Sequence, residues 1–301
     1  MSNGYGLESN SVGHSFGSRA VLKNLSFQVE PAEIAFLAGE NGAGKTTWVR
    51  IALGLLRPRR GAVFYAGMNS QEARSFLAVV FDEPPVYPAH SGSENLHLLS
   101  GRIRLDRKWK DNILSALNID EHFLRMKAGT YSLGQRRRLA LAAALLRRPR
   151  YLILDEPSVG LDPFSVEMVN NCLRQLADKD TVVLLTGQDF NLMEGLLDKV
   201  IVLHDGITAF QGSPADLKAL YPVTLLVRPE NPQELAGILP QGSVANDTHG
   251  QYVQASFPSR REAEAMLLKL QQSEAPFLEL SIRDVSLESA FKSLVSEREV
   301  H

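Results

Sequence analysis

One segment, GENGAGKTT at residues 39–47, limits the chemistry of this chain more than any other. It fits the phosphate-binding pattern G-x-x-x-x-G-K-[ST] at every fixed position. Its glycines allow turns that a Cβ would forbid, so successive backbone N–H groups can point at phosphate oxygens. The apolar run 34–38 before it predicts a strand, and 47–53 after it predicts a helix. The segment therefore predicts a nucleotide-binding loop between a strand and a helix.

Two side chains at the end of this loop carry specific roles. Lys45 is expected to reach the β- and γ-phosphates, while Thr46 supplies a hydroxyl ligand for Mg²⁺. The helix that begins there presents the positive end of its dipole to the same anion. A nucleoside triphosphate and Mg²⁺ are therefore expected to bind at this loop. The residues of the loop expected to contact them are Gly39, Asn41, Gly42, Ala43, Gly44, Lys45, Thr46 and Thr47.

The composition describes a folded and nearly neutral protein. Hydrophobic residues make up 44% of the 301 residues, enough for one large domain and a small one. The 32 basic and 34 acidic residues almost cancel, so no net field draws the chain to nucleic acid or to an anionic membrane. The local basic runs at 57–60 and 136–138 are interpreted as a solvated turn and a helix face. We expect no nucleic-acid partner.

Cysteine use and hydropathy indicate a cytoplasmic protein. The single cysteine, Cys172, excludes an internal disulfide and suits a reducing compartment. Residues 1–6 show no basic segment that leads into an apolar one, and no apolar run approaches the roughly 20 residues that cross a bilayer. If the chain serves a membrane process, we expect another chain to cross the membrane.

A pair of adjacent carboxylates follows a second predicted strand at 151–154. Asp155 is expected to hold the water shell of the Mg²⁺ that Thr46 also binds. Glu156, one residue later, is expected to face the γ-phosphate and to polarise an attacking water. Such a pair is a weak signal by itself, and the phosphate-binding loop makes it a strong one.

The order of apolar runs predicts the fold class. Strand-like runs at 34–38, 151–154 and 181–185 alternate with helical stretches, which predicts an α/β protein with a mostly parallel sheet flanked by helices. A further strand is predicted at 200–203. Between about 94 and 146 the pattern is almost wholly helical, which predicts a helical subdomain inserted into the sheet domain.

Residues 1–220 are predicted to form the first domain, and 221–301 a small accessory α+β domain that Pro222 opens. Ser259 and Glu262 predict a capping box at the start of a helix. A strand with one buried face is predicted from the alternation of Leu278, Leu280 and Ile282 with polar residues. Apolar residues at helical spacing predict two helices, one with Ala263, Met266, Leu267 and Leu270, the other with Leu287, Ala290, Phe291 and Leu294.

Residues 131–135, YSLGQ, lie about twenty residues before the carboxylate pair and begin a predicted helix with Ser132 as its cap. In a chain with a phosphate-binding loop, this order resembles the signature motif of ATP-binding cassette (ABC) ATPases. The resemblance covers about residues 5–215 and implies a P-loop NTPase sheet core of the ABC type. It also implies that Ser132, Gly134 and Gln135 contact nucleotide.

The same resemblance assigns further residues and partners. Phe16 takes the place of the aromatic residue that stacks on adenine, and Asp162 that of the acid in the D-loop. Two such domains are implied to pair head to tail, so that each ATP lies between the phosphate-binding loop of one subunit and Ser132 of the other. The implied partners are a second copy or a homologous ATPase subunit, together with an integral membrane permease.

Two positions depart from the family pattern, and both concern hydrolysis. Gln188 stands in the switch loop where the family usually has a histidine; glutamine can hydrogen-bond the γ-phosphate but carries no positive charge. Asp82, or Glu83 in a register shifted by one residue, stands where a glutamine usually touches Mg²⁺ and the attacking water. A carboxylate still suits a divalent cation. The expected catalytic residues are Glu156, Gln188 and Asp82, and the expected metal ligands are Thr46, Asp155 and Asp82.

The tail resembles the closing segment of exporter ATPases that pair with separate permeases, at residues 280–282 and 285–291. The predicted function is therefore an ATPase subunit of an ABC exporter, peripheral on the inner face of the membrane. The departures at Gln188 and Asp82 leave open a weakly hydrolysing regulatory subunit with a more active homologous partner. ABC proteins that act on ribosomes or DNA, and P-loop kinases, fit the motif order less well.

Overall fold

The computed structural model describes residues 6–101, 106–157, 163–177, 181–190, 193–230, 244–246, 252–273 and 276–299. The chain divides into two compact units, Met1–Ser213 and Pro214–His301. This division lies slightly before the boundary predicted at 220. The reason is that the short helix α7 (Pro214–Lys218) packs against α9 (Leu287–Glu299) of the second unit.

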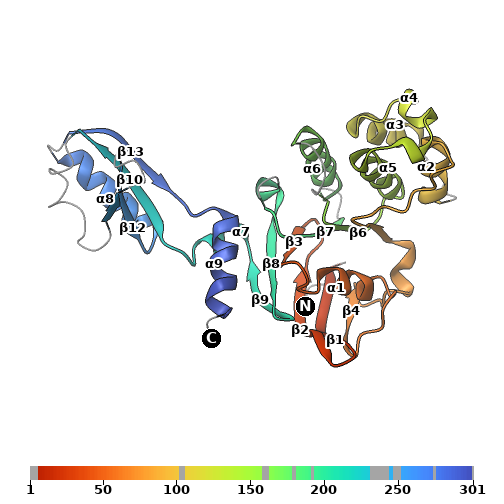
Figure 1. The fold of residues 1–301 in the computed structure, drawn as a ribbon, viewed down its shortest axis with the longest axis horizontal. Coiled ribbons are helices and arrows are strands. Elements are labelled where there is room, and N and C mark those ends of the chain that lie inside the picture. The colour runs from red at the N-terminus through yellow and green to blue at the C-terminus, as the bar shows by residue number, and fades with distance from the viewer. Residues whose placement is uncertain are drawn as a thin grey trace. The chain divides into compact units, whose positions relative to one another are not determined.

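The first unit is built on a nine-stranded sheet of order β4-β1-β2-β9-β8-β3-β7-β6-β5 in the described residues (Figure 1). Its parallel part pairs β8, β3, β7, β6 and β5. Every residue of β3, β6 and β7 is buried, as expected for strands covered on both faces. The α/β class is confirmed. The bounds are β3 Ile34–Ala38, β5 Leu77–Val80, β6 Tyr151–Asp155, β7 Val182–Gly187 and β8 Lys199–His204.

An antiparallel part of the same sheet was not predicted from the sequence. It pairs β1 (Leu7–Phe16) with β2 (Arg19–Val29) and β4 (Arg60–Tyr65), while β9 (Ile207–Gly212) runs antiparallel to β8. Residues of these strands alternate irregularly between buried and exposed, and β1 changes register with β2 at several points. A search for short, continuously apolar runs passes over such strands.

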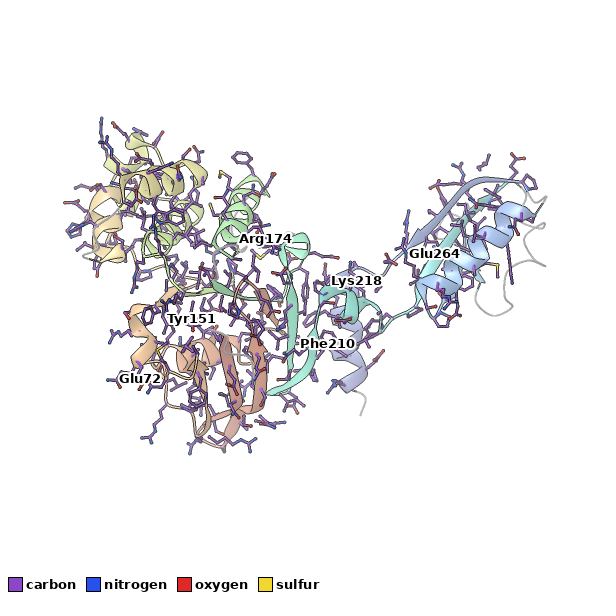
Figure 2. The ribbon with its side chains drawn as sticks, turned by 180° about the vertical axis from the view of Figure 1, so that it is seen from behind. Glu72, Tyr151, Arg174, Phe210, Lys218 and Glu264 are labelled. Atoms are coloured by element: carbon purple, nitrogen blue, oxygen red, sulfur yellow. The ribbon has the colours of Figure 1, made fainter. Side chains whose placement is uncertain are left out.

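Helix α1 (Lys45–Ala52) is buried, and its contacts fix the loop that precedes it. Its Trp48 is fully buried, with its ring centroid 5.0 Å from that of Phe27 on β2, and its indole N–H donates to Ser9 Oγ on β1 at 3.0 Å. Below the other end, the Tyr65 hydroxyl donates to the Ala52 carbonyl at 2.7 Å. The Tyr65 ring in turn packs on Tyr151 of β6, inside the first unit (Figure 2).

The described residues of the inserted helical subdomain form four helices, which pack side by side (Figure 1). They are α2 (Gly92–Ser100), α3 (Arg107–Ala116), α4 (Glu121–Arg125) and α5 (Leu133–Leu146). Each begins at a side-chain N-cap that accepts a backbone N–H; the caps are Ser91, Asp106, Asp120 and Ser132. Helix α6 (Pro163–Ala177) leads back toward β7, and short 3₁₀ turns occur at Glu72–Ser75, Ala128–Thr130 and Glu194–Leu196. Among the described residues, no helix is both long and apolar enough to span a bilayer.

The second unit has an antiparallel sheet of order β11-β12-β10-β13 with α8 (Arg260–Gln272) packed on it. The predicted α+β class is confirmed, and the apolar residues of α9 are buried. Ser259 caps α8, and its Oγ accepts the Glu262 N–H at 3.3 Å. The predicted capping box is incomplete in the described contacts, because the Glu262 carboxylate accepts the Ser259 hydroxyl at 3.0 Å and not the Ser259 N–H. Leu278, however, is 60% exposed, because a register shift in β13 leaves it without a partner on β10. The strands are β10 Val223–Pro229, β11 Val244–Asn246, β12 Val253–Phe257 and β13 Phe277–Arg283.

Candidate functional site

Three loops predicted to carry chemistry follow neighbouring parallel strands. Ala38 at the end of β3 pairs with Gly187 of β7, and Asp155 at the end of β6 pairs with Thr186 of β7. The Gly39 N–H donates to the Gly187 carbonyl at 3.1 Å. In open parallel sheets, ligands bind beyond the carboxyl ends of the strands. The phosphate-binding loop, the carboxylate pair and the switch loop therefore meet at the edge of the sheet where a ligand is expected.

A cavity of about 410 Å³ opens beside the phosphate-binding loop. It brings together residues predicted from three separate motifs: the aromatic position at the end of β1, the loop itself and Glu156. Two of its residues, Arg19 and Val21, were not predicted from the sequence. They belong to β2, and Arg19 pairs with Phe16 in the β1–β2 hairpin. The full lining is Phe16, Arg19, Val21, Asn41, Gly42, Gly44, Lys45, Thr46, Thr47 and Glu156.

The backbone of the loop adopts a conformation that requires glycine at two positions. Gly42 has φ 83° and Gly44 has φ 110°, both in the region that side chains disfavour. A Cβ on Gly44 would lie 2.8 Å from Leu22 Cδ2, whereas one on Gly42 would meet open space. Gly44 is the N-cap of α1, and no side chain caps this helix. No side-chain acceptor at the N-cap therefore takes up the first N–H groups of α1, and N–H groups at a helix start can bind an anion.

Lys45 lies at the centre of this arrangement and is almost fully buried. Its Nζ donates to the carbonyls of Gly39 at 2.7 Å and Glu40 at 3.1 Å, and lies 3.6 Å from Glu156 Oε1. Burial lowers the pKa of Lys45, and the Glu156 carboxylate opposes that shift. A phosphate in the cavity would add negative charge beside this cation. The loop geometry and the placed ammonium therefore fit a nucleotide.

The two predicted carboxylates occupy different environments. Asp155 is buried and accepts a hydrogen bond from the Thr186 hydroxyl, a partner that the sequence did not reveal. Glu156 has φ 51°, and its N–H donates to the Thr186 carbonyl at 3.1 Å. This φ lies in the left-handed region, which is uncommon for residues other than glycine. Glu156 lines the cavity, whereas the preceding residue, Asp155, is buried and does not belong to the lining.

Two residues expected to assist hydrolysis lie elsewhere in this structure. Gln188 is exposed and does not line the cavity. Asp82 is also outside the lining, because its carboxylate forms an ion pair with Arg137 of α5. Whether Asp82 contacts Mg²⁺ when nucleotide is bound stays a prediction. Asp162 lies outside the described residues.

The signature residues cap their own helix. Ser132 Oγ accepts the Gln135 N–H at 3.2 Å, and the Ser132 N–H donates to Gln135 Oε1 at 2.9 Å, which completes a capping box at the start of α5. Ser132 is exposed, and none of the signature residues lines the cavity. Sequence reasoning foresaw the cap at Ser132 and missed the reciprocal bond from Gln135.

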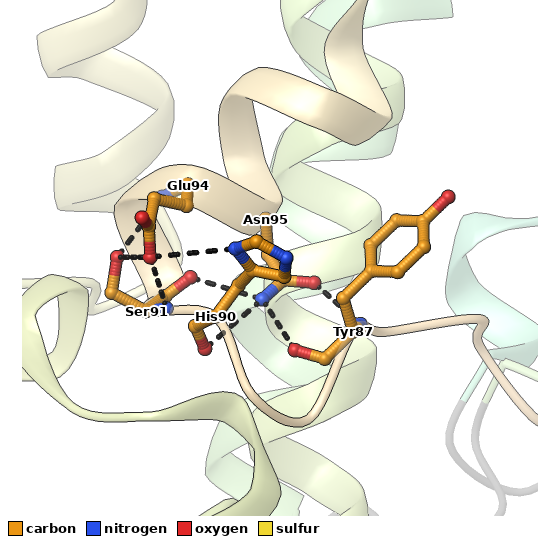
Figure 3. A network of polar contacts seen from close by, with 5 residues as sticks. All are labelled: Tyr87, His90, Ser91, Glu94 and Asn95. Carbon is orange, nitrogen blue, oxygen red and sulfur yellow. Dashed lines mark hydrogen bonds and ion pairs between the residues drawn. The ribbon is translucent and has the colours of Figure 1, made fainter.

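One buried amide organises the loop that connects β5 to α2. Asn95 Oδ1 accepts the Tyr87 N–H at 2.7 Å (Figure 3). Its Nδ2 donates to the carbonyls of Tyr87 at 3.0 Å, Ser91 at 2.9 Å and His90 at 3.3 Å. A single side chain on α2 therefore closes the turn before the helix. A lone asparagine within a helical pattern gave no sequence signal for this role.

Replacing Asn95 by alanine is expected to open this turn. The amide hydrogen of Tyr87 should then exchange about tenfold faster or more, because one to two kcal/mol of hydrogen bonding is lost. Hydrogen–deuterium exchange of the purified chain measures this. His97→Ala, an exposed position on the same helix, serves as the control and should leave the exchange unchanged. Equal exchange in both variants would contradict the role of Asn95.

Comparisons with known proteins agree with this geometry. A family model described as ABC transporter matches residues 22–159. The chain is 33% identical over 70% of its length to the lipopolysaccharide export system ATP-binding protein LptB of Acidithiobacillus ferridurans, covering 91% of that protein. It is 28% identical to the uncharacterized ABC transporter ATP-binding protein YhcH of Bacillus subtilis, over 97% of this chain and 96% of the other.

A solved structure described as the ATP binding subunit of an ABC transporter superposes with a TM-score of 0.65 at 26% identity, covering 70% of this chain and 91% of the other. The residues that the family model matches, 22–159, include the phosphate-binding loop, the signature segment and the carboxylate pair. With fold, motif order and cavity in agreement, the chain belongs to the ATP-binding subunits of ABC transporters.

Proposed function

We propose that this chain is the ATP-hydrolysing subunit of an ABC exporter, which dimerises on ATP and drives a separate permease. The observation that carries the proposal is the cavity that joins the phosphate-binding loop to Glu156. In this cavity, Lys45 Nζ lies 3.6 Å from Glu156 Oε1. Lys45 can therefore bind a phosphate while Glu156 acts on a water molecule beside it.

The phosphate-binding loop, the residues around it and the two carboxylates then have distinct tasks. The N–H groups of the loop and Lys45 bind the phosphates, and Phe16 stacks on the adenine. Thr46 and Asp155 would hold Mg²⁺, which when bound neutralises phosphate charge. Glu156 accepts the proton of the attacking water as the water approaches the γ-phosphate. Arg19, opposite Phe16 in the hairpin, adds a positive charge at the rim of the cavity.

The proposal that two subunits share each ATP is supported by the position of the signature residues. Ser132, Gly134 and Gln135 lie at the start of α5, outside the cavity of their own chain. Ser132 is exposed and is thus available to the cavity of a second subunit. A head-to-tail dimer would bring each signature segment to the other chain's phosphates, and ATP would stabilise the closed dimer because it binds that state better.

A second hollow, of about 700 Å³, provides a surface for the permease. It lies between residues 53–55 and 69–81 of the sheet core and helices α2 and α5 of the helical subdomain. One wall of the hollow has small side chains, which leave room for another segment; they are Ala140, Ala143 and Ala144. Among the described residues, its charged lining residues are Arg74 and Arg147, and no carboxylate belongs to the lining. This surface suits an apolar helical segment with an acidic end, contributed by a membrane protein. The chain would then be peripheral on the cytoplasmic face.

Reversing the charge at this surface is expected to weaken assembly with the permease. The Arg147→Glu variant should co-purify roughly tenfold less with the permease, because its new carboxylate would face the acidic end of the permease segment. Arg125→Glu is the matched control, since Arg125 is an exposed arginine on α4 of the same subdomain that does not line the hollow. Equal co-purification of both variants would place the permease elsewhere.

Export rather than import is supported by the relative named for lipopolysaccharide export and by the resemblance of the tail to exporter ATPases. A substrate accumulated on the far side of a vesicle membrane in the presence of ATP would establish the direction. Uptake that depends on a soluble binding protein would contradict export.

One observation favours a second candidate, a weakly hydrolysing regulatory subunit. In this structure Asp82 is paired with Arg137 and Gln188 is exposed, so neither assists Glu156. Against it stand Lys45 and Glu156, both placed at the cavity. Phosphate release per bound ATP, measured with and without the permease, separates the two. We expect slow release from the chain alone and a higher rate with the permease; no release in either case would favour the regulatory subunit.

A further inference from the structure

Arg137 is a buried cation at the point where the helical subdomain meets the hydrolysis site. It lies on α5, and its side chain is 5% exposed. Its Nε and Nη2 donate to the Asp82 carbonyl at 3.2 Å and 3.0 Å, and Nη2 also contacts the Asp82 carboxylate. The guanidinium thus binds both the backbone and the side chain of Asp82.

The other acids of the site lie close to the same guanidinium. Arg137 and Asp155 both line a small cavity of about 20 Å³, with mostly apolar residues around them. The Glu156 carboxylate contributes to the field at Arg137 and, with Asp82, opposes the lowering of the Arg137 pKa by burial. Nη1 is buried, and it has no hydrogen-bond partner among the described residues. Within the described residues, the ion pair formed by Arg137 is with Asp82.

The two kinds of bond to Asp82 have different consequences. The paired donors on the carbonyl fix the backbone after β5 whether or not the carboxylate is engaged. The carboxylate itself is 49% exposed and can turn away while the backbone stays in place. For the carboxylate to turn away, its hydrogen bond to the charged guanidinium must break. The free energy of that bond therefore opposes any other interaction of the Asp82 carboxylate.

We infer that Arg137 is a positioning residue that holds the Asp82 carboxylate on the side of the helical subdomain, so that Asp82 reaches the metal of bound nucleotide only by leaving Arg137. The inference rests on the proposed function, since it requires that nucleotide and Mg²⁺ occupy the cavity. Position 82 holds an aspartate where the family usually has a glutamine, and Arg137 is the residue that pairs with this aspartate. A merely structural Arg137 would stabilise the loop and leave metal affinity independent of residue 82.

The test is the ratio of the Kd for ADP in EDTA to the Kd for ADP with Mg²⁺, measured by calorimetry on the full chain. Because ADP is not hydrolysed, the ratio reports the contribution of the metal rather than activity. Arg137→Gln frees the carboxylate and should raise the ratio about tenfold, the value of one hydrogen bond to a charged group. In the Asp82→Asn chain the same substitution should leave the ratio unchanged.

Two further variants keep the result interpretable. Arg138→Gln, the adjacent arginine, whose guanidinium lies over the Phe123 ring, should not change the ratio. Arg137→Lys retains a buried cation but lacks the paired donors, so it should raise the ratio less than Arg137→Gln does. If Arg137→Gln folds poorly, the lysine variant still provides the test. An unchanged ratio in both Arg137 variants, or an equal rise in the Asp82→Asn chain, overturns the inference. A wild-type chain that binds no ADP would instead overturn the proposed function.

Discussion

Replacing Glu156 by glutamine is expected to slow ATP hydrolysis by a factor of about a hundred to ten thousand, the usual contribution of a general base. Nucleotide affinity should remain, because glutamine preserves the shape of the side chain and the phosphate-binding residues are unchanged. Steady-state phosphate release and the Kd for ATP, measured on the same preparation, give the two quantities. The size of the effect follows from the position of Glu156, the one carboxylate among the described residues that line the cavity.

The variant also tests the shared site. If ATP holds two subunits together and hydrolysis releases them, Glu156→Gln should accumulate as a dimer in ATP, as seen by sedimentation velocity, while the parent chain remains largely monomeric. Glu40→Gln is a matched control: Glu40 lies in the same loop, contributes to the field at Lys45 and does not line the cavity. A Glu156→Gln variant that hydrolyses as fast as the parent removes Glu156 from its role.

Replacing Gly44 by alanine is expected to lower the stability of the fold more than Glu156→Gln does. The residue has φ 110°, which costs an L-residue about 1–2 kcal/mol, and the new Cβ would lie within contact distance of Leu22 and Val21. Overpacking adds about 1–3 kcal/mol, so a loss near 3 kcal/mol in the stability of the first unit is expected. Affinity for ADP should fall with it, since the loop N–H groups no longer converge.

Gly42→Ala is the control that separates strain from crowding. Gly42 also has positive φ, at 83°, but its Cβ would meet open space. A loss of about 1–2 kcal/mol is therefore expected there. Thermal unfolding, followed by near-UV circular dichroism, compares the two variants. If both lose the same stability, the contact with Leu22 carries no weight and φ alone decides.

The motifs predicted the part of the site that depends on local sequence. The phosphate-binding loop, Asp155 and Glu156 follow strands whose continuous apolar runs are visible in one dimension, and parallel neighbours bring their ends together. Phe16 could be placed only by resemblance, and it does line the cavity. Whether Ser132 and Gln188 contact nucleotide stays a prediction, because each would need a partner subunit or a bound nucleotide.

What the sequence could not show depends on contacts between distant residues. Arg137 and Asp82 are far apart in the chain, and nothing in the run of three arginines indicates that the middle one is buried while its neighbours are partly exposed. Asn95 looks like an ordinary polar residue of a helix until its four bonds are seen. The strands β1, β2 and β4 have mixed burial and a shifting register, so periodicity alone does not reveal them.

The capping box at the start of α5 has a thermodynamic consequence for dimerisation. Ser132 and Gln135 already hold each other in the isolated chain, so their rotamers and the first turn of the helix are fixed before a second subunit arrives. Ordering a flexible surface side chain on association costs about 0.5–1.5 kcal/mol each. Because folding has already fixed the shape of the signature segment, this segment loses little conformational entropy when the dimer closes.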